Sequence, residues 1–230
     1  VGNPGQPGTV AGEGVGGDLA RHLQGHAAAA AVAAVAIVLG GVFSAPEKPT
    51  LTPEQYFARQ EFIINNHIKV HPLALLKHRD LKDRALSETI SNLIVGYDSE
   101  KDFYVNKLAQ GVAKIAAAFY PKKIITRLSD FKSNEYYNLL GGKYFEPDEE
   151  NPMIGWRGAS RYYSDEFREA FNWECEALKK ARDEFGLDNI TIMVPFCRTP
   201  QELEKVLGIM KENGLERGKQ GLEIYLMAEL

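Results

Sequence analysis

The chain has 230 residues, of which 44% are hydrophobic and 25% are charged, and its formal net charge is −4. This composition is ordinary for a soluble globular protein, and the slight acidic excess excludes a general affinity for nucleic acid. The chain has two cysteines, Cys175 and Cys197, whose spacing excludes a cysteine metal site and disfavours a disulfide framework, so a reducing cytoplasm is the expected compartment.

The N-terminal part, residues 1–57, differs in composition from the rest. Its first 17 residues are rich in Gly and Pro and are typical of an irregular loop. Ala27–Phe43 carries no charge, but its length is at the lower limit of the about 20 residues that span a bilayer. A buried Ala-rich helix is the reading we favour over a membrane span or a signal peptide. Thr52 and Pro53 then indicate the start of a helix.

From residue 58 onward, hydrophobic periodicity predicts alternating helices and strands. Helices are predicted over Glu61–Leu76 with a break at Pro72, over Ser99–Pro121, over Ser164–Gly186 and over Thr199–Gly214. Strands are predicted over Lys122–Asp130, Asn151–Tyr163, Asn189–Phe196 and Gly221–Leu230. This alternation predicts an α/β fold with a parallel sheet, either a barrel or a doubly wound sheet.

Helix boundaries are indicated by capping residues. Ser164 and Thr199 are the predicted N-caps of the last two helices, and Pro200 suits the first position of the final one. Gly186 and Gly214 are predicted to close these helices.

Charged residues follow the predicted strands: Arg127 with Asp130, Arg157, Arg198 and Glu229. In a parallel barrel the loops after the strands share one face, so these side chains are expected to meet there. The arginine forks match the oxygens of a phosphate or a carboxylate, although each arginine could instead pair with a structural carboxylate. The carboxylate of Glu229, at the end of its predicted strand, is a suitable ligand for Mg²⁺. Alternatively, it is an exposed side chain at the end of the strand without a ligand role.

Other reactive side chains give weaker signals. His67, His71 and His78 have helical spacing, but an intervening proline breaks the helix, so no metal site is expected there. Cys175 lies among helical residues and is expected to pack in the core, and Cys197 lacks a sequence signature for a neighbouring base.

Several long segments resemble one family: "EFIINNHIKVHP", "FYPKKIITR", "RLSDFKSNEY", "ENPMIGWRGASRY" and "MAEL". They look like the phosphoenolpyruvate (PEP) synthases, the pyruvate, water dikinases of the PEP-utilising enzyme family. The resemblance runs from about residue 58 to residue 230, some three quarters of the chain. It implies a fragment of the C-terminal PEP-binding (β/α)8 TIM barrel, with about the first five strands.

The resemblance also implies an activity and partners. Such enzymes convert ATP, pyruvate and water into AMP, PEP and phosphate, through a phosphohistidine on a swivelling domain and with Mg²⁺. The implied partners are pyruvate or PEP, the phosphohistidine and ATP-grasp domains of a longer protein, and in some cases a second copy in a homodimer.

Four residues of this chain match functional positions in the family motifs, and the resemblance implies a role for each. Arg59, Arg127 and Arg157 would bind the substrate, the last of them near the transferred phosphoryl group. Glu229 would bind the substrate and hold Mg²⁺. The family's phosphorylated histidine and its proton-donating cysteine have no match here, so no catalytic residue is expected within this fragment.

The chain departs from the family pattern near its start. Residues 17–57 interrupt the first barrel strand, either as an insertion or as an artefact of the gene model, which leaves the placement of Arg59 open. We interpret the chain as a fragment that does not turn over alone, because a part-barrel leaves sheet edges open. The alternatives are a pyruvate phosphate dikinase-like enzyme and a non-catalytic, membrane-tethered remnant of the barrel.

Overall fold

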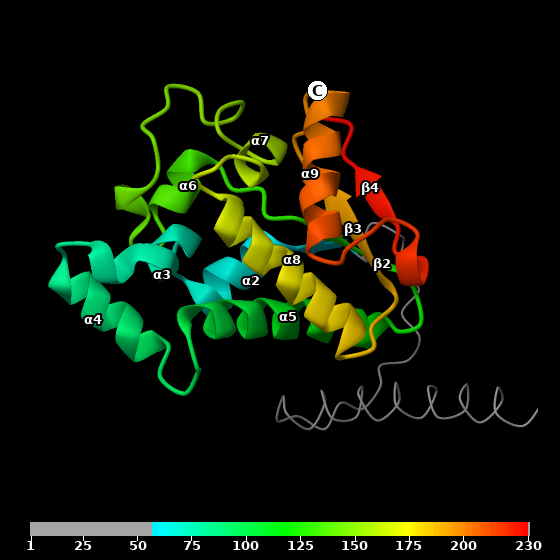
Figure 1. Ribbon diagram of the computed structural model, residues 1–230, viewed down its shortest axis with the longest axis horizontal. Coiled ribbons are helices and arrows are strands. Elements are labelled where there is room, and N and C mark those ends of the chain that lie inside the picture. Colours follow the sequence, from blue (N-terminus) through cyan, green and yellow to red (C-terminus); the bar gives the residue numbers. More distant parts are fainter. Residues whose placement is uncertain (1–56, 230) are drawn as a thin grey trace, which may run out of the picture. The chain divides into compact units, whose positions relative to one another are not determined.

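The computed structural model describes residues 57–229 (Figure 1). The Gly- and Pro-rich loop, the Ala-rich run and the helix start at Thr52 lie outside the described residues. Within residues 57–229, none of the helices combines the length and the hydropathy needed to cross a membrane.

The described part alternates strands with helices. The strands are β1 (Phe57–Arg59), β2 (Ile124–Arg127), β3 (Ile190–Val194) and β4 (Ile224–Leu226). The α-helices are α2 (Gln60–Ile63), α3 (Pro72–Lys77), α4 (Arg84–Leu93), α5 (Glu100–Phe119), α6 (Ser133–Tyr137), α7 (Ala159–Tyr162), α8 (Arg168–Asp183) and α9 (Pro200–Glu212). Short π or 3-10 turns are η2 (Ile64–Ile68), η3 (His78–Asp80), η4 (Gly142–Tyr144) and η5 (Lys219–Gly221).

The four strands form one parallel sheet in the order β1-β2-β3-β4. Parallel neighbours need a long crossover between them, and α5, α8 and α9 lie in the three connections. The register sets Arg59 beside Arg127 and Arg127 beside Met193, so the carboxyl ends of β1, β2 and β3 lie at one edge of the sheet. The predicted parallel α/β sheet is confirmed.

The two faces of the sheet differ in burial. Ile124 and Ile192 are fully buried in one hydrophobic core with side chains of α5 and α8. Phe57, Ile125 and Met193, on the alternate positions of the strands, are only half-buried and lie outside that core, whereas Thr191, beside Ile125 on the same face, is buried. Successive strand residues point to opposite faces, so the helices cover one face of the sheet.

Helix α5 is the longest element within residues 57–229, and it lies side by side with α8 in Figure 1. The Ser99 hydroxyl caps it by accepting a hydrogen bond from the Asp102 N–H at 3.0 Å. Gly111 allows α2 to approach closely, because a Cβ there would lie 2.4 Å from Cγ2 of Ile63.

The strand predicted over Asn151–Tyr163 is wrong. This segment is a loop that ends in the short helix α7. Its peptide groups are engaged by side chains instead of a neighbouring strand: Arg198 donates to the carbonyl groups of Ile154 and Gly155, both at 2.9 Å, and Glu149 accepts from the Trp156 N–H at 2.9 Å. An apolar run of this length does not by itself separate a strand from a folded loop.

Two predicted helix boundaries also differ from the structure. Helix α8 begins at Arg168, because Ser164 belongs to the preceding turn and its hydroxyl donates to the Arg161 carbonyl group at 2.8 Å. The helix predicted over Glu61–Leu76 ends before Pro72, at Lys69, whose φ of 64° is left-handed. The Thr199 cap of α9 is confirmed, with the Glu202 N–H donating to its hydroxyl at 3.2 Å.

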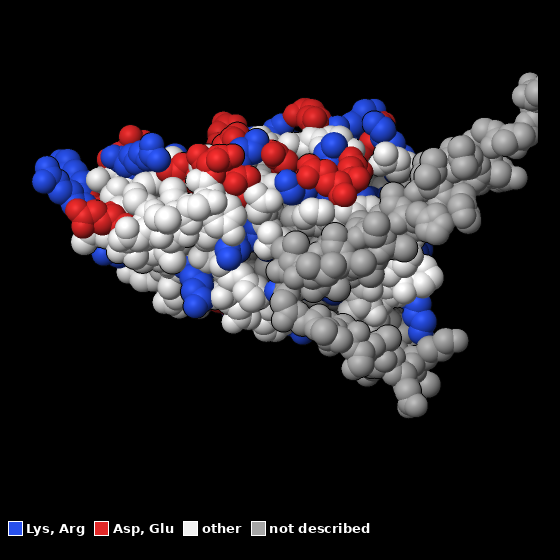
Figure 2. Space-filling view, turned by 90° about the horizontal axis from the view of Figure 1, so that it is seen from below, with Lys and Arg blue, Asp and Glu red and all other residues white. Residues whose placement is uncertain are grey.

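The surface carries both signs of charge. On the face drawn in Figure 2, acidic and basic residues alternate along one edge and border a broad uncharged area. Ion pairs at the surface of residues 57–229 include Lys101 with Glu176 at 2.7 Å and Lys179 with Asp183 at 2.9 Å. Such exposed pairs contribute little to stability, at most about 1 kcal/mol each.

Candidate functional site

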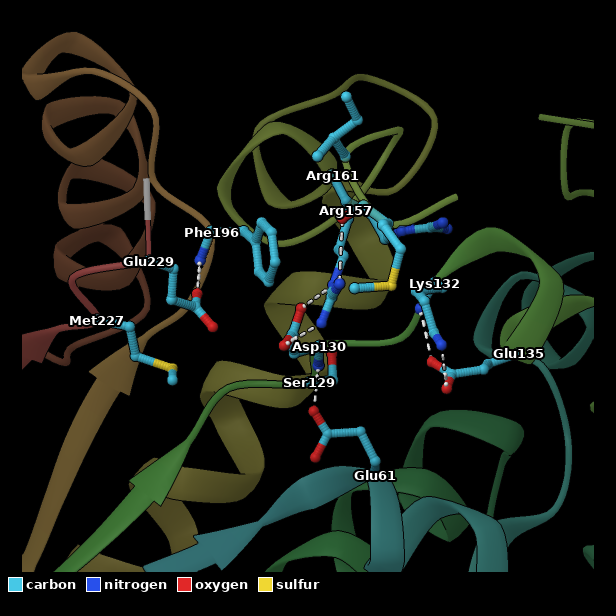
Figure 3. A network of polar contacts seen from close by, with 12 residues as sticks. Glu61, Ser129, Asp130, Lys132, Glu135, Arg157, Arg161, Phe196, Met227 and Glu229 are labelled. Carbon is cyan, nitrogen blue, oxygen red and sulfur yellow. Dashed lines mark hydrogen bonds and ion pairs between the residues drawn. The ribbon is translucent and has the colours of Figure 1, made fainter. Parts of the chain in front are cut away.

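The carboxyl edge of the sheet gathers most of the charged residues that the sequence singled out. Arg59 and Arg127 end β1 and β2, Arg198 follows β3, and Glu229 follows β4. Arg157 does not follow a strand, since its segment is a loop, yet its guanidinium reaches the same edge through Asp130 (Figure 3).

Asp130 is the centre of the polar network at this edge. Its side chain is fully buried and accepts two hydrogen bonds from Arg157, from Nε at 2.6 Å and from Nη2 at 2.9 Å. It also pairs with Nη1 of Arg127 at 3.1 Å. Both arginines therefore do pair with a carboxylate, as the alternative interpretation held, and they share the same one.

Glu61 holds the same loop from the other side. Its Oε1 accepts from Nη2 of Arg127 at 3.0 Å and from the Asp130 N–H at 2.5 Å. Burial raises the pKa of Glu61 above its ordinary value, and the Arg127 charge only partly offsets this. Among the contacts of residues 57–229, its second oxygen, Oε2, is buried without a hydrogen-bond partner, as is Nε of Arg127. Sequence reasoning missed Glu61, although it lies two residues beyond Arg59.

Phe196 joins the loop after β3 to two of the predicted site residues. The guanidinium of Arg157 lies 3.7 Å from the centre of the Phe196 ring, and the Phe196 N–H donates to Oε2 of Glu229 at 2.9 Å. Figure 3 shows the ring between the Glu229 carboxylate and Arg157. The backbone of Phe196 has a φ of 43°, a conformation that a non-glycine residue adopts only where its surroundings enforce it.

The loop that carries Arg157 is anchored by an arginine buried among aromatic rings. Arg161 donates two hydrogen bonds to Glu146, at 2.6 and 2.8 Å, and two more to the Trp156 carbonyl group. Its guanidinium lies 4.0 Å from the centre of the Trp156 ring and 4.6 Å from that of Tyr136. Burial acts to raise the pKa of Glu146, but the hydrogen bonds from His71 and Arg161 outweigh it and hold that pKa below its ordinary value.

Gly158 sets how closely this loop approaches the loop after β3. Its φ is +59°, and a Cβ there would lie 2.5 Å from Cβ of Phe196 and 2.7 Å from the Pro195 carbonyl oxygen. Glycine is therefore needed next to Arg157 for the two loops to meet.

Arg59 takes no part in this network through any contact seen in residues 57–229. Its side chain is exposed, and its guanidinium lies 5.2 Å from the centre of the Phe62 ring. The strand register nevertheless places it directly beside Arg127.

The segment after Asp130 is held by a local contact between a lysine and a glutamate. The Lys132 N–H donates to Oε2 of Glu135 at 2.9 Å, and Nζ of Lys132 lies 3.2 Å from Oε1 of the same carboxylate. These contacts close the first turn of α6.

Residues 57–229 contain no group of three or more His, Cys, Asp and Glu side chains that could hold a metal ion. Mg²⁺ commonly takes only one or two protein carboxylates and completes its shell with substrate oxygens and water. Glu229 fits that role, because it is an exposed hard oxygen ligand with one oxygen bound to the Phe196 N–H.

The histidines and cysteines have other partners. His71 lies 2.8 Å from Glu146, and His78 lies 3.0 Å from both Ser87 and Glu100. Cys175 is buried in the core as predicted, and burial raises the pKa of the Cys197 thiol, which disfavours a reactive thiolate.

Comparison with known proteins identifies the family. Residues 78–230 match the model of the PEP-utilising enzyme, PEP-binding domain. Among similar proteins is the phosphoenolpyruvate synthase of Synechocystis, which is 60% identical over 174 residues, 75% of this chain and 21% of that protein. The phosphoenolpyruvate synthase of Aquifex aeolicus is 49% identical over 218 residues, with 75% and 26% covered, and that of Escherichia coli is 53% identical over 173 residues, with 75% and 22% covered.

The chain thus spans about a quarter or less of the length of these relatives. The family match covers the loop of Asp130, the loop of Arg157 and the strand before Glu229, and the fold is the parallel α/β arrangement that the resemblance implied. By this match the chain belongs to the PEP-utilising enzymes, within their PEP-binding domain.

Proposed function

We propose that the chain forms part of the pyruvate and PEP site of a phosphoenolpyruvate synthase, which makes PEP, AMP and phosphate from ATP, pyruvate and water. The similarity to proteins of that name supports the assignment. The observation that carries it is the convergence of two guanidinium groups, Arg127 and Arg157, on one buried carboxylate at the carboxyl edge of the sheet.

The arginines suit a ligand that carries both a phosphate and a carboxylate. Arg157 makes two hydrogen bonds to Asp130 and one, at 3.1 Å, to the Met153 carbonyl group. A guanidinium has five N–H groups, so these bonds are compatible with further donation to an anion. In this proposal Arg157 lies near the transferred phosphoryl group, where positioned cations stabilise the charge on its oxygens, and Arg59 and Arg127 bind the rest of the substrate.

The balance of charges around the two arginines favours a bound metal cation. Glu61 and Asp130 offset the charges of Arg127 and Arg157, so a highly charged anion there gains from an additional cation. We assign Glu229 as the ligand that would hold Mg²⁺ beside the substrate. When bound, Mg²⁺ would act as a Lewis acid that favours the enolate oxygen over the ketone.

We further propose that residues 58–230 are the first part of a (β/α)8 barrel. The half-buried side chains of Phe57, Ile125 and Met193, on the face of the sheet opposite the helical core, support this, because such side chains would point to the inside of a closed barrel. The phosphohistidine and ATP-grasp domains of a longer protein would be its partners, a homodimer its assembly, and the cytoplasm its location.

Titration calorimetry of PEP into the full chain tests the site. We expect binding that is strengthened by Mg²⁺, because the metal would bridge the ligand to Glu229. In the Glu229→Gln variant the Mg²⁺ enhancement is lost while metal-free binding remains. Absence of PEP binding at millimolar ligand, with the chain folded by circular dichroism, would reject the proposed site.

A further inference from the structure

Glu174, in the middle of α8, is a buried carboxylate near the site to which the proposed function assigns no role. The residue is 1% exposed. Both of its oxygens accept hydrogen bonds from one residue, Ser129: Oε1 from the N–H and Oε2 from the hydroxyl, each at 2.7 Å.

Each polar group of Ser129, namely its N–H, its hydroxyl and its carbonyl group, takes part in a hydrogen bond. Besides the two bonds to Glu174, its hydroxyl accepts from the Tyr136 hydroxyl at 3.3 Å, and its carbonyl group accepts from the Tyr162 hydroxyl at 2.6 Å. Side chains of α6, α7 and α8 thus fix this residue, which is itself 1% exposed.

The next residue is Asp130, whose N–H is bound by Glu61 at 2.5 Å. Two successive peptide N–H groups are therefore held by two carboxylates that come from different helices. With the backbone fixed on both sides, the direction of the Asp130 side chain is set, and that side chain receives both Arg127 and Arg157.

A buried carboxylate is a costly way to hold a serine. Burial raises the pKa of Glu174 to about 7, which reflects the loss of solvation of the charged form. Two hydrogen bonds from Ser129 to the same carboxyl group, one from its backbone and one from its side chain, restrict both, so what this arrangement gains is a fixed geometry. Supporting residues of this kind commonly keep a binding site in register.

We propose that Glu174 is a positioning residue: through Ser129 it orients Asp130, and through Asp130 it aims the guanidinium groups of Arg127 and Arg157 at the anion. The anion part of this inference rests on the proposed function, whereas the orientation of the arginines can be measured without any ligand.

The experiment compares Glu174→Gln and Ser129→Ala with the full unmodified chain. Leu178→Ala is the matched control, because Leu178 is a fully buried residue one turn along the same helix. Two quantities are measured: the position of the Arg157 Nε–H resonance by nitrogen-15 NMR, and the dissociation constant for PEP with Mg²⁺. Ser129→Ala removes only one hydroxyl group. If Glu174→Gln does not fold, Ser129→Ala still tests whether the contact between Glu174 and Ser129 positions Arg157.

We expect both network variants to move the Arg157 resonance toward that of a free guanidinium and to weaken PEP binding about tenfold. Leu178→Ala is expected to lower the melting temperature without changing either quantity. Wild-type resonance and affinity in the network variants, or equal changes in Leu178→Ala, would overturn the inference. If the unmodified chain binds no PEP, the proposed function fails and the resonance alone decides whether Glu174 positions Arg157.

Discussion

Asp130 shows why a buried ion pair can matter more for geometry than for stability. Its side chain is fully buried and is shared by Arg127 and Arg157. The free-energy cost of removing the charges from water is about as large as the attraction between them, so a buried ion pair adds little to the net stability. What it does provide is a fixed direction for two planar donors from segments far apart in the chain.

Substitution of Arg157 by Lys tests that geometry. Lysine keeps the charge but loses the fork that donates from Nε and Nη2 to Asp130. We expect PEP affinity to fall by roughly ten- to a hundredfold, about 1.4–2.7 kcal/mol, in calorimetric titration. Arg217→Lys, at an exposed position, is the control and is expected to bind as the unmodified chain does. Equal affinities for the two variants would contradict the role of the fork.

The pKa of Glu174 predicts a pH dependence of stability. In the folded chain this carboxyl keeps its proton up to about pH 7, whereas its ordinary value is 4.5. Between these values the folded state binds more protons than the unfolded state, so the free energy of unfolding falls as the pH rises.

Urea unfolding at pH 5 and pH 8 measures this effect against Glu174→Gln, which cannot titrate. The stability of the unmodified chain relative to the variant is expected to be lower at pH 8 by on the order of 1–3 kcal/mol. Glu61, whose pKa is also raised, contributes in the same direction but is present in both proteins. A difference that does not change with pH would show that Glu174 is not protonated in the folded chain.

At the scale of elements, helix starts depend on single side chains. The Ser99 hydroxyl accepts the Asp102 N–H at the start of α5, the helix that packs against α8. We expect Ser99→Ala to lower the free energy of unfolding by about 1 kcal/mol. Ser91→Ala, at an exposed position inside α4, is the matched control and is expected to have almost no effect. Equal losses in urea unfolding would rule out the cap as the cause.

Helix α7 fixes the loop of Arg157 through one buried arginine. Arg161→Met removes the arginine that pairs with the buried Glu146 and leaves that carboxylate its hydrogen bond to His71, so a loss of about 3–5 kcal/mol is expected. Arg168→Met, which removes a more exposed pair with Glu212, is expected to cost at most about 1 kcal/mol. Thermal unfolding of both variants distinguishes the two cases, and similar melting temperatures would be the contrary result.

For the whole molecule, we expect the chain alone to form no PEP from ATP and pyruvate. A four-strand sheet has open edges and a half-buried face, and the proposed reaction needs further domains. A coupled assay for PEP on the purified chain measures this, and appreciable ATP-dependent product would refute it. In a longer protein that contains this chain, dependence of the reaction on phosphate would favour the dikinase alternative.

Much of the fold could be predicted from local sequence. The strands around Ile124 and Ile190 and the cap at Thr199 are determined by neighbouring residues, so periodicity and capping rules found them. The segment from Asn151 to Tyr163 could not be predicted, because its carbonyl groups bind arginines such as Arg198 from distant parts of the chain.

The candidate site also has residues that the sequence could predict and residues that it could not. Its arginines and Glu229 were found from strand ends and family motifs, and their roles stay predictions. Nothing local marked Glu61 or Glu174, since each acts on a loop more than 40 positions away. A contact of that kind depends on how helices dock, which no short window of sequence contains.

The amino-acid sequence by itself determined the strands β2, β3 and β4, the long helices α5, α8 and α9, the parallel sheet and the family, because these depend on periodicity and on contiguous motifs. Only the tertiary structure decided that Arg127 and Arg157 share one carboxylate, and that Ser129 lies on the buried Glu174. The reason is physical: burial and hydrogen bonding between distant segments appear only once the chain is packed, and there they set both the charge balance and the direction of each side chain.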